Sequence, residues 1–252
     1  MPRFLHRVGP CLFIATVICY LAGNFFIDHL DKASLKLARS QNKNQQYIDI
    51  GTVSHVVILA KNELLQRPNI KVVFDSHASQ VFIKNDNLGF SVDAKVADNV
   101  LNIVFDMPVK NYRYEQLEPL IISLPLTVND VGVAGTNTIE VSNNSPTPKA
   151  ELNIEMLGCE PLIYVNKMAV NRLKLATQSN PSSVNKSCQS LFNLGETVRI
   201  DNLDVSMEQG SLEFTADVVP KQALLSLGDT VKISGTGAFM RAAHFTKLEP
   251  AP

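Results

Sequence analysis

ELNIEMLGCEPLIYV, from Glu151 to Val165, contains two short apolar runs that meet at a hinge, Gly158. Each run is short, rich in branched apolar residues and bounded by a turn former, which is typical of a β-strand. Cys159 follows the hinge directly. The stretch therefore predicts two strands joined by a turn, with a cysteine in the turn.

Runs like the first half of this stretch recur through the C-terminal half. Three of their four intervals are 21 residues and one is 30, because the runs begin at Val131, Leu152, Leu173, Leu203 and Leu224. The longer interval contains a polar insertion, Gln178 to Ser190. A second run follows in each unit, and these runs begin at Thr138, Leu162, Thr197, Ser211 and Thr230. A chance coincidence of β-rich segments is the alternative to a true repeat.

A unit of this length cannot bury its own apolar face, whereas stacked units bury a continuous one. The repeat therefore predicts an all-β fold, a parallel β-helix-like β-solenoid with roughly 21-residue coils stacked about 4.8 Å apart. The side chains expected to point inward are Leu152, Ile154, Leu173, Leu175, Leu203, Val205, Leu212 and Phe214. The polar alternates expected outside are Asn153, Glu155, Lys174, Asp204 and Glu213.

Upstream of the repeat, β-branched runs alternate with turn formers. The strands predicted there are Ile70–Phe74, Gln80–Lys84, Gly89–Ala94, Val100–Phe105 and Leu120–Leu124. Val53–Leu65 fits a helix or a strand.

The N-terminal residues have the pattern of a membrane anchor. Val8–Ile27 is uncharged, mostly apolar and preceded by a short basic start. At about 1.5 Å per helical residue it is long enough to cross a bilayer core of about 30 Å. A removed signal peptide is the alternative, but its apolar region is shorter and ends in a site of small residues. We expect an uncleaved transmembrane helix over residues 1–28, followed by an amphipathic stalk and polar linker over 29–47.

The charges around this helix bear on its orientation. Asp28 and Asp31 lie nearest its far end, and a short basic tail before a first helix is usual for a cytoplasmic N-terminus. We expect a single-pass protein of the inner (cytoplasmic) membrane. Its solenoid domain, residues 48–240, and C-terminal tail, residues 241–252, would lie in the periplasm or outside the cell.

Two of the four cysteines, Cys11 and Cys19, fall in the apolar segment, where a thiol behaves as a small hydrophobic group. Cys159 and Cys188 remain in the exported part, where an oxidising compartment permits a disulfide. Stacked coils would bring their turns within bridging distance. We expect a Cys159–Cys188 disulfide, with two unpaired thiols or a reactive cysteine as the alternatives.

Four stretches of upstream strands and Gly-punctuated runs carry a family resemblance: IKVVFDSHASQVFIKN (Ile70–Asn85), NVLNIVFDMP (Asn99–Pro108), IISLPLTVNDVGVAGTNTIEV (Ile121–Val141) and VKISGTGAF (Val231–Phe239), which contains Ser-Gly-Thr-Gly. With these stretches the chain resembles a bacterial family of unknown function, the auto-transporter adhesin head (GIN) domain. It implies a right-handed β-solenoid-like domain outside the cytoplasm and an adhesin role. The chain departs from the family in having fewer Gly-Ser-Gly turns, an anchor and a cysteine-bearing insertion.

Composition excludes one class of partner. The net charge is -1 at pH 7, and the 23 basic and 24 acidic side chains are mixed along the chain. A protein that binds DNA or RNA usually concentrates positive charge on one surface. No nucleic-acid partner is therefore expected.

Two polar stretches upstream have residue types that occur in functional sites. FDSHAS, Phe74–Ser79, contains the aspartate, histidine and serines of a hydrolase, but a triad is assembled from separate parts of a fold. Turn chemistry explains such neighbours better. Asn85–Gly89 resembles part of a calcium loop but lacks its later glutamate.

Paired carboxylates could perform acid–base chemistry on one face of a solenoid. The candidates are Asp201 with Asp204, and Glu208 with Glu213, but a solvated polar face explains them as well. His55 and His244 are isolated in the sequence, so no metal and no cofactor is expected.

The expected function is a non-enzymatic binding or scaffold module of the bacterial envelope. Its partners would be the inner membrane, through the N-terminal helix, and an envelope protein or a glycan. The alternatives are an envelope enzyme acting on glycan and a membrane-tethered sensor.

Overall fold

The structure is a computed structural model that describes residues 45–60, 69–85, 91–106, 119–135, 138–158, 161–178, 190–195, 197–215 and 218–248. All of these belong to one compact unit that begins at Asn44. They form eighteen strands and one short helix. The prediction of an all-β fold is confirmed for these residues.

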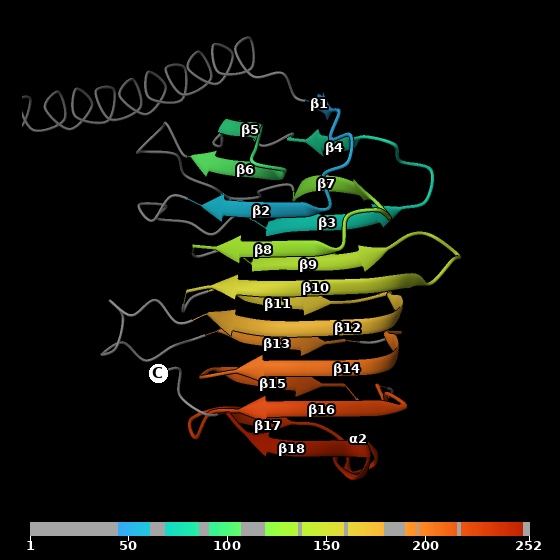
Figure 1. Ribbon diagram of the computed structural model, residues 1–252, viewed down its shortest axis with the longest axis vertical. Coiled ribbons are helices and arrows are strands. Elements are labelled where there is room, and N and C mark those ends of the chain that lie inside the picture. The colour runs from blue at the N-terminus through green and yellow to red at the C-terminus, as the bar shows by residue number, and fades with distance from the viewer. Residues whose placement is uncertain are drawn as a thin grey trace, which may run out of the picture. The chain divides into compact units, whose positions relative to one another are not determined.

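Two nine-stranded sheets contain all of these strands (Figure 1). In spatial order, sheet A contains β1 (Gln45–Ile48), β4 (Val81–Lys84), β7 (Leu120–Pro125), β3 (Asn69–Asp75), β9 (Thr138–Asn143), β11 (Leu162–Val165), β13 (Leu191–Leu194), β15 (Ser211–Phe214) and β17 (Lys232–Ser234). Sheet B contains β5 (Ser91–Ala97), β6 (Val100–Asp106), β2 (His55–Ala60), β8 (Asp130–Ala134), β10 (Lys149–Leu157), β12 (Ala169–Gln178), β14 (Arg199–Met207), β16 (Gln222–Leu227) and β18 (Ala243–Lys247).

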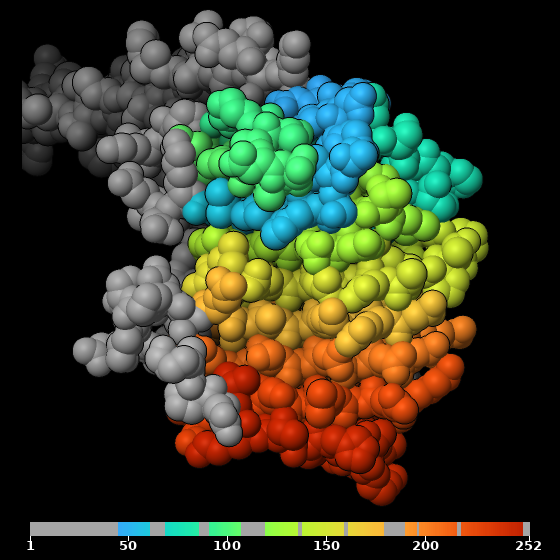
Figure 2. Space-filling view, viewed as in Figure 1, coloured from blue at the N-terminus to red at the C-terminus, as the bar shows by residue number. Residues whose placement is uncertain are grey.

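From β8 onward the chain alternates between the sheets, and each strand pairs in parallel with the next strand of its own sheet. Successive strands therefore appear in Figure 2 as bands of colour that follow the chain. Both sheets are mixed, because β1, β4 and β5 pair antiparallel to their neighbours.

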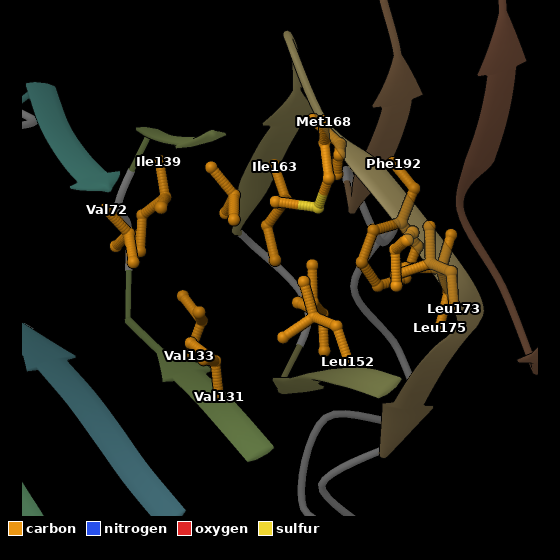
Figure 3. Packing of buried hydrophobic residues seen from close by; sticks show 14 of the residues in the cluster. Val72, Val131, Val133, Ile139, Leu152, Ile163, Met168, Leu173, Leu175 and Phe192 are labelled. Atoms are coloured by element: carbon orange, nitrogen blue, oxygen red, sulfur yellow. The ribbon is translucent and has the colours of Figure 1, made fainter. Parts of the chain in front are cut away.

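The register confirms the central part of the repeat. Leu152 pairs with Leu173, and Leu173 with Leu203, as the intervals of 21 and 30 residues predict. The eight side chains predicted to point inward are all buried between the sheets. Figure 3 shows buried side chains from the two sheets facing one another, among them Leu152 of β10 and Ile163 of β11. The five polar residues expected outside are partly exposed and lie outside this core.

The register differs from the prediction at both ends of the repeat. Val131 pairs with Ile154 instead of Leu152, and Leu203 pairs with Ala223 instead of Leu224. The doublet Leu224–Leu225 allows two phases of alternation, and a one-residue slip exchanges the two faces of a strand. Because Ala223 and Leu225 point inward, Leu224 lies outside and is 48% exposed.

The prediction that the run beginning at Thr197 is the second strand of its unit is also wrong. Thr197 has a positive φ of 61° and lies in the turn before β14, so Arg199 and Ile200 begin that sheet B strand. The sheet A strand in this part of the chain is β13, which pairs with β11 and β15. The run LFNL follows the polar insertion directly, so its apolar pattern was hidden at the edge of a loop.

All five strands predicted upstream are present, as β3 to β7. Within Val53–Leu65 the described part is a strand, β2, rather than a helix. The predicted anchor, Val8–Ile27, lies outside the described residues, within which no helix is long and apolar enough to cross a bilayer. Sheet B continues through β18, beyond the expected domain boundary at residue 240.

The short helix, α2 (Gly237–Ala242), covers one end of the core. Thr236 is its N-cap, and the Thr236 hydroxyl accepts a hydrogen bond from the Phe239 amide at 3.3 Å. The Phe239 ring is fully buried and stacks on Phe214 with ring centroids 3.7 Å apart. An aromatic side chain thus closes the apolar interior where the strands stop.

The register of β16 predicts unequal effects of two neighbouring substitutions. Leu225→Ala should lower the free energy of unfolding by about 2–5 kcal/mol, because it leaves a cavity in the core. Leu224→Ala should change it by less than about 0.5 kcal/mol, since that side chain is exposed. Urea unfolding of the purified proteins measures both. A larger loss for Leu224→Ala would contradict this register.

Candidate functional site

A line of side chains crosses the outer face of sheet A. Lys71, Glu140 and Tyr164 are direct partners on β3, β9 and β11, and the line continues through Asn193 of β13 to Glu213 of β15. Their strand neighbours Ile70, Ile139, Ile163, Phe192 and Leu212 are buried. Since successive side chains of a strand point to opposite faces, these five side chains point outward at steps of about 4.8 Å. We call them the outer row of sheet A.

Two polar pairs flank the tyrosine in the outer row. Lys71 Nζ lies 3.6 Å from Glu140 Oε2, with 46% and 37% of the two side chains exposed. On the other side, Asn193 Nδ2 donates a hydrogen bond to Glu213 Oε2 at 2.9 Å. An exposed ion pair of this length contributes little stability, so both of its charged groups can also serve a ligand.

A groove of about 440 Å³ lies over the start of the outer row. This volume is within the range of small-molecule sites. Its polar and aromatic lining comes from Asn69, Lys71, Thr138, Glu140, Tyr164 and Asn166. The groove therefore combines an ammonium, a carboxylate, amides, a hydroxyl and an aromatic ring on a rigid sheet.

A second polar cluster is buried between the sheets. Lys149, at the start of β10, is only 2% exposed, and its Nζ donates to the Leu126 carbonyl at 2.6 Å and to Asn129 Oδ1 at 3.0 Å. Nζ also lies 4.8 Å from the centre of the Phe74 ring. Burial lowers the pKa of Lys149 to about 8, although nearby Asp130 acts in the opposite direction.

The position of Lys149 explains why sequence reasoning missed it. It pairs with Val170, which pairs with Ile200, so it occupies a buried position that is apolar in the next two strands of sheet B. In each of the three strands, two exposed or half-exposed residues follow this position before the next buried residue. The regular alternation of buried and exposed residues therefore fails here. Lys149 fastens the turn before β8 to the core and is too buried to meet a ligand.

The outer face of sheet B carries ion pairs between neighbouring strands. Arg172 Nη2 lies 2.8 Å from Asp204 Oδ2, and Lys174 Nζ lies 2.9 Å from Glu151 Oε1. The hydrogen bond from Lys174 holds the pKa of Glu151 below its usual value, and the bond to Asp204 raises the pKa of Arg172. These contacts connect neighbouring strands of sheet B and do not surround a cavity.

The carboxylates suggested by the sequence are either paired with cations or divided between the two sheets. Asp201 pairs with Lys221 at 2.8 Å, and Asp204 with Arg172. Glu208 follows β14 of sheet B, while Glu213 lies in β15 of sheet A, so these two do not share the sheet face that the enzymatic alternative requires.

The turn after β3 shows the chemistry expected of FDSHAS. The His77 amide donates to Asp75 Oδ1 at 2.8 Å, and the Ala78 amide to the Asp75 carbonyl at 3.3 Å. Of the calcium-like stretch, only the buried Asn85 is described.

The remaining candidates are two histidines and two cysteines. His55 is the register partner of Asp130, and His244 that of Leu224. Across the described ranges, no three His, Cys, Asp or Glu side chains are grouped to hold a metal. Cys159 and Cys188 lie outside the described residues, so their disulfide stays a prediction.

Sequence comparisons find no matching protein family and no matching curated protein. Among solved structures, the chain is similar to a "putative adhesin" from Bacteroides fragilis, at 13% identity and TM-score 0.37 over 82% of this chain and 98% of that one. A "putative cell adhesion protein" from Clostridium sporogenes gives 8% identity and TM-score 0.32 over 76% and 98%. A "putative lipid binding protein" from Parabacteroides distasonis gives 10% and 0.37 over 82% and 98%. At this level of similarity, function has to be argued from the chain's own surface.

Burial of Lys149 predicts a particular pH dependence of stability. Its pKa falls from 10.5 to about 8 on folding, so between these values the unfolded state binds more protons. The free energy of unfolding should therefore rise with pH across this window, by up to about 3 kcal/mol, and this contribution should be absent below it.

The matched variant is Lys149→Met, which keeps a long side chain but cannot titrate. Urea unfolding at pH 7, 8.5 and 10 should show wild type gaining stability relative to the variant as pH rises, while other titrating groups affect both equally. Parallel pH curves for the two proteins would show that Lys149 keeps an ordinary pKa in the fold.

Proposed function

We propose that this chain is a membrane-anchored, exported β-solenoid of the GIN-domain type, and that it serves as a binding or scaffold module of the bacterial cell envelope. Parallel pairing between strands of successive coils supports the solenoid, with register offsets that run from 20 residues at Leu203–Ala223 to 30 at Leu173–Leu203. The apolar run Val8–Ile27 supports the anchor and export.

The observation that carries the binding role is the outer row of sheet A. Parallel hydrogen bonding fixes its five side chains at regular spacing on adjacent strands. The backbone amides and carbonyls beneath them serve the strand ladder, so a ligand on this face is recognised by side chains. A rigid row of polar groups around one tyrosine suits recognition without chemistry.

We propose that the protein is not an enzyme. A glycan-acting enzyme needs a carboxylic acid and a carboxylate at a set separation around the scissile bond. Asp201 and Asp204 each pair with a cation, and Glu208 and Glu213 belong to different sheets. These four carboxylates, which were the candidates from the sequence, therefore do not favour the enzymatic alternative.

The binding role predicts contacts that depend on the face of the molecule. A photo-crosslinking amino acid would replace Tyr164 on sheet A or, as the matched control, Leu224 on sheet B, in the full chain in its native host. Leu224 is exposed and lies outside the outer row. We expect a discrete envelope component to be crosslinked from position 164 in the membrane fraction and not from position 224.

Two results would contradict the proposal. One is that positions 164 and 224 give the same crosslinked products, or that neither position gives any. The other is recovery of the full chain from the soluble cytoplasmic fraction, which would remove the anchor and the envelope together.

A further inference from the structure

The groove on sheet A is balanced in charge. Among the described residues that line it, the charged groups are the Lys71 ammonium and the Glu140 carboxylate, which lie 3.6 Å apart and are both partly exposed. A strongly charged ligand would therefore meet one favourable and one unfavourable group. The groove suits a ligand that is neutral overall and that both donates and accepts hydrogen bonds.

The location of the groove on a sheet face also restricts its ligand. An extended peptide usually gains affinity by adding a strand to a sheet edge, where unpaired amides and carbonyls are available. β3, β9 and β11 all lie inside sheet A, with a paired strand on each side. A bound chain would therefore depend on hydrogen bonds to side chains alone.

Tyr164 adds an apolar surface with a polar end to this groove. It lies between Glu140 on one side and Asn193 on the other, and Asn166 follows it on the groove wall. An aromatic ring of this kind packs against an apolar face of a ligand, while its hydroxyl can hydrogen-bond. The adjacent amides both donate and accept, and the carboxylate accepts.

We propose that this groove binds a neutral segment of a glycan, with a sugar ring packed on Tyr164 and its hydroxyl groups bonded to Glu140, Lys71 and Asn166. Sugars combine apolar C–H faces with hydroxyl groups that donate and accept, which is the combination that the groove offers. The inference rests on the proposed binding function and names its ligand class.

The outer row indicates that the ligand is longer than one sugar. It extends beyond the groove to the Asn193–Glu213 pair, and five strands at about 4.8 Å span roughly 20 Å from Lys71 to Glu213. Since the same types of groups continue along this line, an oligosaccharide would meet more of them than a single sugar would. Affinity should therefore increase from a disaccharide to a tetrasaccharide.

The test uses the full chain in lipid nanodiscs and titration calorimetry. The probes are cellotetraose, chitotetraose, maltotetraose, their disaccharides and soluble muramidase fragments of peptidoglycan. We expect at least one of these glycans to bind, with the tetrasaccharide bound more tightly than the disaccharide. Tyr164→Ala should weaken that binding by about tenfold or more, as expected for an aromatic residue at the centre of a contact.

Three further variants separate the contributions. Tyr164→Phe keeps the ring and should retain most of the affinity, while Glu140→Gln should weaken binding by loss of a charged acceptor. Tyr47→Ala is the matched control, because Tyr47 is an exposed tyrosine of β1, at the edge of sheet A and outside the groove. It should bind as wild type does. Unchanged thermal midpoints show that each variant is folded.

Two outcomes would overturn the glycan inference: no binding of any probe by wild type, or equal affinity of wild type, Tyr164→Ala and Glu140→Gln. The proposed function fails differently. If position 164 still crosslinks an envelope protein while no glycan binds, the binding module stands and its ligand is a protein. If neither experiment shows contact at this face, both proposals fall.

Discussion

The register between neighbouring strands of each sheet is the constraint on which the rest of the structure depends. Parallel pairing sets Leu152 beside Leu173 and Leu203 on the buried face of sheet B. A slip of one residue would turn each of these side chains outward, because strand side chains alternate between faces. The same pairing in sheet A places Glu140 beside Tyr164. Parallel hydrogen bonding between strands thus builds the core in sheet B and the candidate site in sheet A.

The two ends of the stack differ from its middle, as the ends of a repeat structure must if they are not to leave an apolar interior exposed. At one end β1, β4 and β5 pair antiparallel. At the other, α2 inserts Phe239 against Phe214. The candidate groove lies between these ends, and each of its strands β3, β9 and β11 is paired in parallel with a strand on both sides.

Part of the candidate site was readable from the repeat. Glu140, Tyr164, Asn193 and Glu213 are each the third residue of a second run, in TIEV, LIYV, LFNL and SLEF. Assigning the third coil to the run at Thr197 removed Asn193 from this series, so the row was not recognised. Lys71 belongs to an upstream strand that the repeat does not reach, and only pairing of β3 with β9 brings it beside Glu140.

The sequence alone determined the all-β class, the position of most strands and the inward side chains. These features depend on the local alternation of apolar and polar residues and on the spacing of the central repeat units in the sequence. Tertiary structure decided the phase at Leu224, the burial of Lys149 and the grouping of the outer row. Each of these depends on which strand lies alongside, and backbone pairing between distant segments makes that choice. ELNIEMLGCEPLIYV shows both: its sequence specifies two strands, and its neighbours in sheet A make Tyr164 part of a candidate binding face.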